Sequence, residues 1–314
     1  MGTRDDHPRS VISEQRAHAV LAEYEIALAG ARLATQTRRA YRSRVAGYLA
    51  WLTTLAIDGD PLAGPAARDQ AVRAYRSWLA HRQGLQPATV NAVLTALDHF
   101  YEHLRLGKAA TGREPVPAAV RRALPPDAQH HLLRVVDEHD SARDRAVAYT
   151  LLFTGVRVAE LVGLDGSDLL LVPRHERLVV RRDGAGREIP LHHRARPALQ
   201  EWLTAREEWV GSTTGTRALF LNRRGGRLSA RSVDELVAHF GEQAGLNDHK
   251  RLTPQVLRHT FGENLVRAGA DLLLVASLMG HKRLDTTRRY AEQDLSGAAS
   301  RSADAARAVE RAYA

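Results

Sequence analysis

Apolar residues recur every three or four positions through most of the first hundred residues, which is the pattern of amphipathic helices. In the second of these stretches, Thr35 or Thr37 precedes the apolar stripe and is a candidate N-cap. Pro87 stands where the fourth stretch would begin, a position that proline favours. The stretches with this pattern are 13–30, 34–56, 68–83 and 88–106. Together they predict a compact helical domain over residues 1–106.

Prolines and glycines crowd the next segment, residues 107–127, and this density predicts a linker. A second domain is expected over 128–314, with a last helix in its alanine-rich C-terminal stretch. Two β-branched runs, ERLVVRRDG and GREIPLH, are joined through Asp183 and Gly184, which predicts a β-hairpin. Helical patterns surround it at about 126–139, 141–155, 194–210, 229–245, 254–268 and 271–279. The expected fold class is therefore mainly α with a small β-hairpin or sheet, in two domains.

The composition is that of a globular, strongly cationic protein. The 314 residues are 44% hydrophobic, carry a formal net charge of +9 and include no cysteine, which excludes disulfides and thiolate-bound metals. No apolar run reaches the roughly 18 residues of a membrane span, so a cytoplasmic, nucleoid-associated protein is expected. The charge predicts an acidic polymer as partner.

The basic residues are almost all arginine, because only three of the 45 are lysine. Arginine forks match phosphate oxygens, although a GC-rich genome would produce the same bias. Basic residues at the start of the second helical stretch, in the linker and near the C-terminus are candidates for contact with nucleic-acid phosphates. They are Arg38, Arg39, Arg42, Arg121, Arg122 and Lys282.

Three stretches of the second domain contain residues suited to phosphate chemistry. FTGVRVAELVGL places Arg157 at the joint between two helices, and LTPQVLRHTF places Gln255 and Arg258 on one side of a helical turn. LMGHKRLDTTRRY contains His281 and ends in Tyr290. Each has an ordinary structural interpretation taken singly: a salt bridge at a helix end, a core histidine or a half-buried tyrosine.

In this order the three stretches resemble the tyrosine recombinase or phage integrase family, the Xer-like and Cre-like enzymes in particular. The resemblance covers nearly the whole chain. It implies that Tyr290 attacks a DNA phosphate and forms a 3′-phosphotyrosyl link, while Arg157, Arg258 and His281 stabilise the charge on the phosphate oxygens. It also implies that no metal, nucleotide or other cofactor is consumed, because the covalent bond conserves the phosphodiester energy.

Two positions depart from the family pattern. Gln255 replaces the usual histidine, so it can donate a hydrogen bond to phosphate but cannot shuttle a proton. The hairpin lacks the usual lysine, and Arg182 falls at its position, or Asp183 after a one-residue deletion. A guanidinium, with a pKa above ~12, is a poor proton donor, so Arg182 is expected to act electrostatically. Lys282 and the remoter Lys250 are competing candidate acids.

Two further residues of these boxes have weaker claims. Glu160 resembles a family carboxylate that supports the site, or it is a surface charge. His259 is expected to be structural.

The expectation is a two-domain DNA clamp for site-specific recombination. It would bind double-stranded DNA, and a homo-tetramer, alone or with a second recombinase, would exchange strands through a Holliday junction. The C-terminal helix would dock on a neighbouring subunit. Three alternatives stay open: a DNA-binding relative with weakened or lost cleavage, a type IB topoisomerase-like enzyme, and a helical transcription regulator without catalysis.

Overall fold

The computed structural model describes two compact units, residues 1–119 and 120–314. The described residues are 9–10, 12–116, 122–173, 175–182, 185–209, 215–246, 251–280 and 298–313. The side chains of residues 9, 10, 182, 185 and 298–302 are outside this description. Both units are mainly helical, and the second contains a small sheet, so the expected fold class is confirmed.

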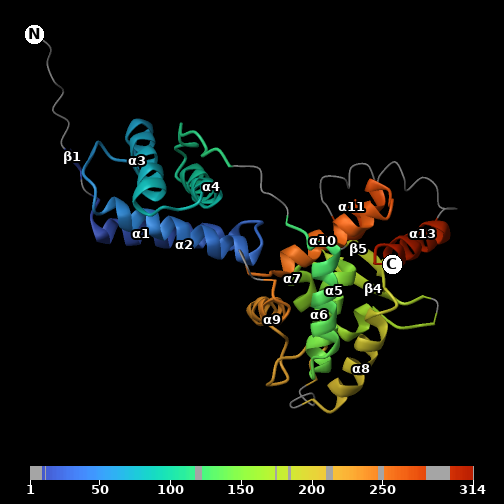
Figure 1. The fold of residues 1–314 in the computed structure, drawn as a ribbon. Coiled ribbons are helices and arrows are strands. Elements are labelled where there is room, and N and C mark those ends of the chain that lie inside the picture. Colours follow the sequence, from blue (N-terminus) through green and yellow to red (C-terminus); the bar gives the residue numbers. More distant parts are fainter. Residues whose placement is uncertain are drawn as a thin grey trace, which may run out of the picture. The chain divides into compact units, whose positions relative to one another are not determined.

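Within its described residues the first unit has four α-helices, each close to a stretch expected from the sequence. Helix α2 packs against both α1 and α4 (Figure 1). A two-residue strand pair, Arg9–Ser10 with Ile57–Asp58, was not expected, because two residues are too few to show alternation. The helices are α1 (Glu14–Gly30), α2 (Thr35–Leu52), α3 (Pro65–Ser77), which continues as a π-helical turn (Trp78–Arg82), and α4 (Pro87–His103).

The start of α2 differs from expectation. Its N-cap is Ala34, no side chain caps the helix, and Thr35 is already its first residue. The expectation of a threonine cap at Thr35 or Thr37 was therefore wrong. Pro87 does begin α4, where its missing N–H and fixed φ suit the first turn.

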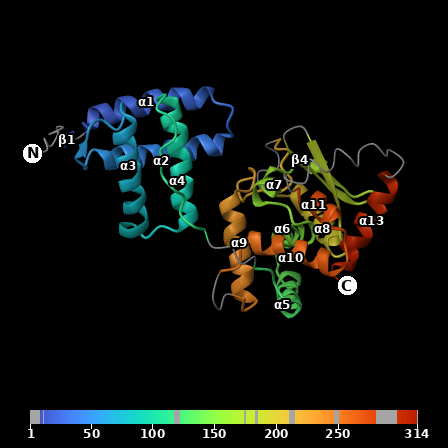
Figure 2. The same ribbon diagram turned by 90° about the horizontal axis from the view of Figure 1, so that it is seen from above.

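One helix, α6, lies at the centre of the second unit and is buried on nearly all sides. Ten of the 13 residues of α6 are buried, which is expected only of a helix at the centre of a domain. Helices α5, α8, α9 and α10 pack against it (Figure 2). The helices are α5 (Pro126–Asp137), α6 (Ala142–Thr154), α7 (Val158–Gly163), α8 (Ala195–Glu207), α9 (Ala230–Gln243), α10 (Pro254–Arg267), α11 (Leu272–Met279) and α13 (Ala298–Arg311).

The sheet of this unit is antiparallel and has the order β3-β4-β5, with β3 at Leu169–Leu170, β4 at Arg177–Arg182 and β5 at Ala185–Pro190. The hairpin β4–β5 was expected and is confirmed, with Val180 opposite Arg187. A 3-10 turn, Gly166–Asp168, leads into β3. Helix α13 lies alongside β5 (Figures 1 and 2). β5 therefore contacts both the C-terminal helix and, through Arg187, the candidate site.

The boundary between the units, at 119/120, falls within the segment expected as a linker. Residues 107–116 are bonded to the first unit: Arg76 donates to the carbonyl of Gly112, and Asn91 is bonded to Glu114 in both directions. On the other side of the boundary, the N–H of Leu124 donates to Thr260 of the second unit. None of the helices in the described part of the chain combines the length and the apolar character that a membrane span needs.

Candidate active site

Arg157 is positioned by the sharp turn between α6 and α7. Gly155 ends α6 in the left-handed conformation, with φ of 58°, and a Cβ there would lie 2.4 Å from Cδ1 of Phe261. Only glycine fits this turn. Arg157 is then the N-cap of α7, and its backbone N–H and Nη1 donate to Glu160 at 2.8 and 3.0 Å. The Arg157 side chain is 33% exposed, so it is held on one side and open on the other.

Arg258, expected beside Arg157, lies next to it on α10. Its side chain is buried, and its guanidinium donates to the backbone carbonyls of Gly155 and Met279. Burial, together with the charge of Arg157, lowers the pKa of Arg258 to about 10 against the opposing effect of Glu160. Arg258 therefore remains cationic at neutral pH.

A third arginine, Arg187 on β5, completes the cluster. Its Nη1 and Nη2 donate to the two carboxylate oxygens of Glu160 at 3.0 and 2.7 Å, a bidentate pair in which both side chains are buried. Glu160 is thus not a surface charge: among the residues that the structure describes, it is the carboxylate bonded within this group of three guanidinium groups. The surplus of two positive charges suits a phosphate.

The charge of Glu160 is strongly stabilised. Burial alone would raise its pKa, but hydrogen bonds from Arg187 and from the N–H of Arg157, with both positive charges, lower it to about 2. The carboxylate is therefore ionised at any physiological pH and is unsuited to general acid catalysis. Its role in the cluster is to hold the arginines.

The three arginines also converge on the end of α11. Arg187 donates from Nε to the carbonyl of Leu278 at 2.8 Å, Arg258 donates to that of Met279, and Arg157 donates from Nη2 to that of Gly280 at 3.1 Å. The last carbonyls of a helix lack intrahelical partners and carry partial negative charge, which cations satisfy. The site is thus connected to the residue that directly precedes His281 in the chain.

Gln255, the residue at the position of the missing histidine, is exposed on the first turn of α10. Its Nε2 lies 2.7 Å from Nε2 of His259, one turn further along the same helix. The amide is therefore held by an imidazole that sequence reasoning treated as structural.

The hairpin contributes basic side chains beyond Arg187. Arg181 is exposed and pairs with the buried carboxylate of Asp168. Arg182 is paired with Ala185 at the end of the β4–β5 ladder, and its side chain lies outside the described residues.

Several expected site residues are not placed. His281, Tyr290, Lys282, Lys250 and Arg121 all lie outside the described residues, so the structure brings together Arg157, Arg258 and Glu160 but does not test the nucleophile.

The other expected DNA contacts that the structure describes are residues of the first unit and Arg122 of the second. Arg39 is exposed on α2, Arg38 donates to the carbonyl of Ala29, and Arg42 pairs with Glu25 at 2.6 Å. On the second unit, Arg122 donates to the carbonyl of Leu246 at 3.0 Å.

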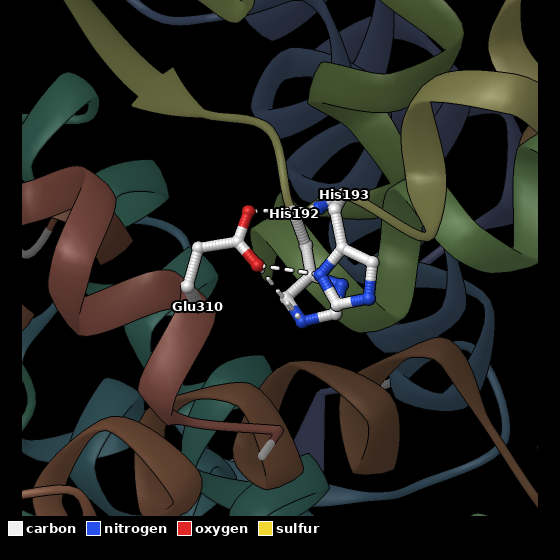
Figure 3. A group of neighbouring side chains, drawn as sticks. All are labelled: His192, His193 and Glu310. Atoms are coloured by element: carbon white, nitrogen blue, oxygen red, sulfur yellow. Dashed lines mark hydrogen bonds and ion pairs between the residues drawn. The ribbon is translucent and has the colours of Figure 1, made fainter.

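The C-terminal helix α13 is held in the second unit by Glu310, whose carboxylate faces two imidazoles (Figure 3). One carboxylate oxygen lies 2.6 Å from Nδ1 of His193 and 3.5 Å from Nε2 of His192, and the other accepts from the backbone of His193 at 2.9 Å and from Arg196 at 3.3 Å. Tyr313, whose ring contacts that of His192, donates a hydrogen bond from its hydroxyl to the carbonyl of Leu152.

His192, His193 and Glu310 are residue types that bind metal ions, and their ligand atoms lie within 4.8 Å of one another. The hydrogen bonds favour a different interpretation. Nδ1 of His192 accepts from the N–H of Arg194 at 3.2 Å, so the proton of the neutral ring is on Nε2, which lies 3.5 Å from Glu310 and has no hydrogen-bond partner among the described residues. Burial lowers the pKa of His192 to about 4 against the effect of Glu310, so this ring is neutral at neutral pH. Because Arg196 also compensates Glu310, the group is an anchor for α13.

Sequence reasoning missed the central role of Arg187, although a signal was present. Arg187 and Ile189 on β5 and Leu191 directly after it are buried, whereas Gly186 and Glu188 on β5 are exposed. Strict alternation therefore placed Arg187 on the core-facing side of the strand. An arginine on a buried face requires an anionic partner, and Glu160 supplies it.

Comparisons with known proteins point to one family. The profile of the phage integrase family matches residues 122–296. The chain is 38% identical over 212 residues to tyrosine recombinase XerC of Pelobacter propionicus, covering 64% of this chain and 68% of that relative. It is 37% identical over 226 residues to tyrosine recombinase XerC of Haemophilus ducreyi, covering 68% and 71%. A solved post-cleavage complex of a XerH site-specific recombinase with its difH substrate superposes with a TM-score of 0.65 at 20% identity, over 90% of this chain and 82% of that one. At that identity the structural likeness establishes the fold alone.

Proposed function

This chain belongs to the phage integrase family, and we propose that it is a site-specific DNA recombinase that cuts and rejoins double-stranded DNA through Tyr290. The phenolic oxygen of Tyr290 attacks the phosphorus and forms a 3′-phosphotyrosyl bond. The bond from phosphorus to the 5′ oxygen breaks, and that oxygen leaves as a hydroxyl. Rejoining is the reverse reaction with a new 5′ hydroxyl. One phosphodiester replaces another, so neither a cofactor nor a metal is required.

The observation that supports this proposal most strongly is the convergence of Arg157 and Arg258. They come from separate helices, and Glu160 orders the first while backbone carbonyls order the second. Fixed cations stabilise charge that develops on phosphate oxygens without reorganising during the reaction. Arg157 is the more exposed of the two and is assigned to the non-bridging oxygens. The guanidinium of Arg258 carries five N–H groups, and two of its nitrogens donate to backbone carbonyls. Its other N–H groups and His281 are assigned to the same phosphate.

Gln255 and Arg182 are assigned supporting roles in this reaction. Gln255 contacts the phosphate as a neutral donor, so Tyr290 loses its proton to water or to another group. Arg182 supplies positive charge near the departing 5′ oxygen, which takes its proton from water or from another residue. A DNA with sulfur at the 5′ leaving position tests this assignment, because sulfur needs no acid: it should rescue Arg182→Ala, and failure to do so would remove Arg182 from the leaving-group step.

The same proposal assigns the larger architecture. Residues 1–106 bind the core DNA, 107–127 connect the two parts, and 128–314 catalyse, so that the chain clamps a duplex in the cytoplasm. Arg38, Arg39, Arg42, Arg121, Arg122 and Lys282 contact the DNA phosphates. Recombination then proceeds through a Holliday junction in a tetramer of this chain, alone or with a second recombinase.

The C-terminal helix is assigned to subunit contacts within the tetramer. In the described structure α13 occupies a seat on its own chain, made by β5 and α10. The same helix docks on a neighbouring subunit in the assembled tetramer.

Capture of the covalent intermediate tests the nucleophile and also finds the target. The protein is isolated from cells under denaturing conditions, and the DNA attached to it is sequenced to locate the crossover site. A duplex of that sequence, nicked beside the scissile phosphate, then traps the adduct because the short 5′ fragment diffuses away. Tyr290→Phe should give no adduct, whereas Tyr41→Phe, which removes a hydroxyl from the first unit, should give the normal amount.

One competing function is favoured by specific residues. Gln255 and the lysine-free hairpin would suit a DNA-binding relative with weakened or lost cleavage. Normal DNA binding without any adduct from the unmodified chain would establish that alternative.

A further inference from the structure

Arg187 is enclosed within the second unit and cannot act as a free cation. Its side chain is 8% exposed, and its Nη1, Nη2 and Nε donate to Glu160 Oε1, Glu160 Oε2 and the carbonyl of Leu278, at 3.0, 2.7 and 2.8 Å. All these acceptors belong to the protein. Any influence of Arg187 on DNA chemistry is therefore exerted through the residues that it holds.

Arg187 affects the position of Arg157 first through Glu160. Its Oε1 accepts from both Arg187 Nη1 and Arg157 Nη1, each at 3.0 Å, and its Oε2 accepts from both Arg187 Nη2 and the backbone N–H of Arg157. The planar fork of Arg187 fixes the plane of the carboxylate. If the carboxylate rotated, the backbone and the guanidinium of Arg157 would both lose a bond.

Arg187 also affects the position of Arg157 through the backbone at the end of α11. A Cβ on Gly280 would lie 2.7 Å from Nη1 of Arg187, so the guanidinium is in close contact with the chain there. Gly280 has φ of 63°, and its carbonyl accepts from Nη2 of Arg157 at 3.1 Å. Arg187 thus supports Gly280, which is a second acceptor of Arg157 and also the residue directly before His281.

We propose that Arg187 is a positioning residue for strand cleavage, which orients Arg157 by holding Glu160 on one side and the Gly280 backbone on the other. The inference rests on the proposed function, because it requires Arg157 to act on the phosphate. Lysine cannot take this place, since one ammonium nitrogen cannot span two carboxylate oxygens and a carbonyl with the geometry of a guanidinium.

The test compares Arg187→Lys with the unmodified chain in single-turnover cleavage of the nicked duplex. Displacement of a catalytic group by a fraction of an ångström to one ångström is expected to slow cleavage on the order of 10- to 100-fold, with DNA binding unchanged. The matched control is Arg177→Lys, which changes an arginine of the neighbouring strand that pairs with Glu188 at 3.2 Å. Its cleavage rate should remain normal.

A neutral substrate separates positioning from general damage. Replacing one non-bridging oxygen of the scissile phosphate by methyl removes the charge that Arg157 stabilises. The deficit of Arg187→Lys should then largely disappear, whereas a variant with a damaged fold would cut both substrates poorly. Glu160→Gln, which keeps the shape of the side chain but removes its charge, should show the same selective loss and serves if Arg187→Lys fails to fold.

The outcomes separate the two proposals. Equal loss on both substrates, or no loss on either while Tyr290→Phe is inactive, overturns the role of Arg187 and leaves the proposed function intact. An adduct formed by Tyr290→Phe overturns the proposed function itself.

Discussion

The guanidinium groups of Arg157 and Arg258 donate to the carbonyls of two successive residues, Gly280 and Met279. The backbone at the end of α11 thus orients two arginines, Arg157 at the start of α7 and Arg258 on α10. Any shift at the end of α11 would move both cations together. This connects the arginine cluster to the segment that carries His281 and Tyr290 in the sequence.

The first prediction concerns the geometry of Arg258. In Arg258→Lys the positive charge remains, but a single nitrogen cannot bond to the carbonyls of both Gly155 and Met279 as the guanidinium does. Cleavage of the nicked duplex should slow on the order of 100-fold, as when one donor to a developing negative charge is removed, while DNA binding persists. The control is Arg267→Lys on the same helix, where the arginine pairs with exposed Glu263. Equal rates for the two variants would remove Arg258 from the reaction.

The second prediction is a pH dependence of stability that comes from Glu160. Its pKa in the folded chain is about 2, below the ordinary value of 4.5. As the pH falls, the unfolded carboxylate takes up a proton first, so the stabilisation is complete above about pH 5 and is lost between about 4.5 and 2. Urea unfolding should show the unmodified chain more stable than Glu160→Gln at pH 7, with the difference shrinking below pH 5. Glu263→Gln should show little difference at any pH, because Glu263 is exposed.

The third prediction concerns the contact between Gln255 and His259. His259→Ala removes the ring that lies 2.7 Å from the amide. A lost hydrogen bond of about 1 kcal/mol corresponds to roughly fivefold slower cleavage. In a Gln255→Ala background the same change should have little further effect, because the two residues would act as a unit. Additive losses in single-turnover rates would show that His259 acts independently of Gln255.

The fourth prediction tests the turn that presents Arg157. Gly155→Ala places a Cβ 2.4 Å from Phe261 and forces a non-glycine residue to a φ of 58°. The conformation alone disfavours alanine by about 1–2 kcal/mol, and the clash adds to it, so the free energy of unfolding in urea should fall by more than that. Gly163→Ala is the control, because Gly163 has no neighbouring atom within 4 Å of a Cβ and no positive φ. A similar stability for both variants would contradict this account of the turn.

Periodic segments were predictable from the sequence, and the reason is visible in α2 and α4. Their buried residues recur every three or four positions, as in Val45, Tyr48, Leu49 and Leu52, so local pattern and tertiary burial coincide. The central helix α6 shows the limit of such reasoning. It is buried on nearly all sides, and its place at the centre follows from how the other helices surround it.

The candidate site could be predicted only in part, because some of its contacts join residues that lie far apart in the sequence. Arg157 and Arg258 occur in recognisable local sequences, but the role of Arg187 depends on Glu160, 27 residues earlier on a different element. The alternation along β5 indicates that Arg187 is buried, yet only the fold shows what it bonds to. Likewise, nothing local to His192 and His193 indicates that Glu310 will lie against them.

The last prediction concerns the attachment of α13 to its seat. Glu310→Gln keeps the size of the side chain but removes the charge that pairs with Arg196 and faces both imidazoles. Hydrogen bonds to charged groups contribute about 1.5–3 kcal/mol, so local opening of α13 should become about tenfold more frequent or greater. Hydrogen exchange of the α13 amides at constant pH measures this opening.

Asp304→Asn is the matched control for this experiment, because Asp304 pairs with Arg307 on the exposed face of the same helix. It changes the charge of α13 by the same amount without touching the seat. If α13 opened equally often in both variants, its apolar face, with Ala305, Ala308 and Val309 buried, would be holding the helix without help from the carboxylate. A selective increase in Glu310→Gln would instead show that this one carboxylate decides how firmly α13 is held on its own chain.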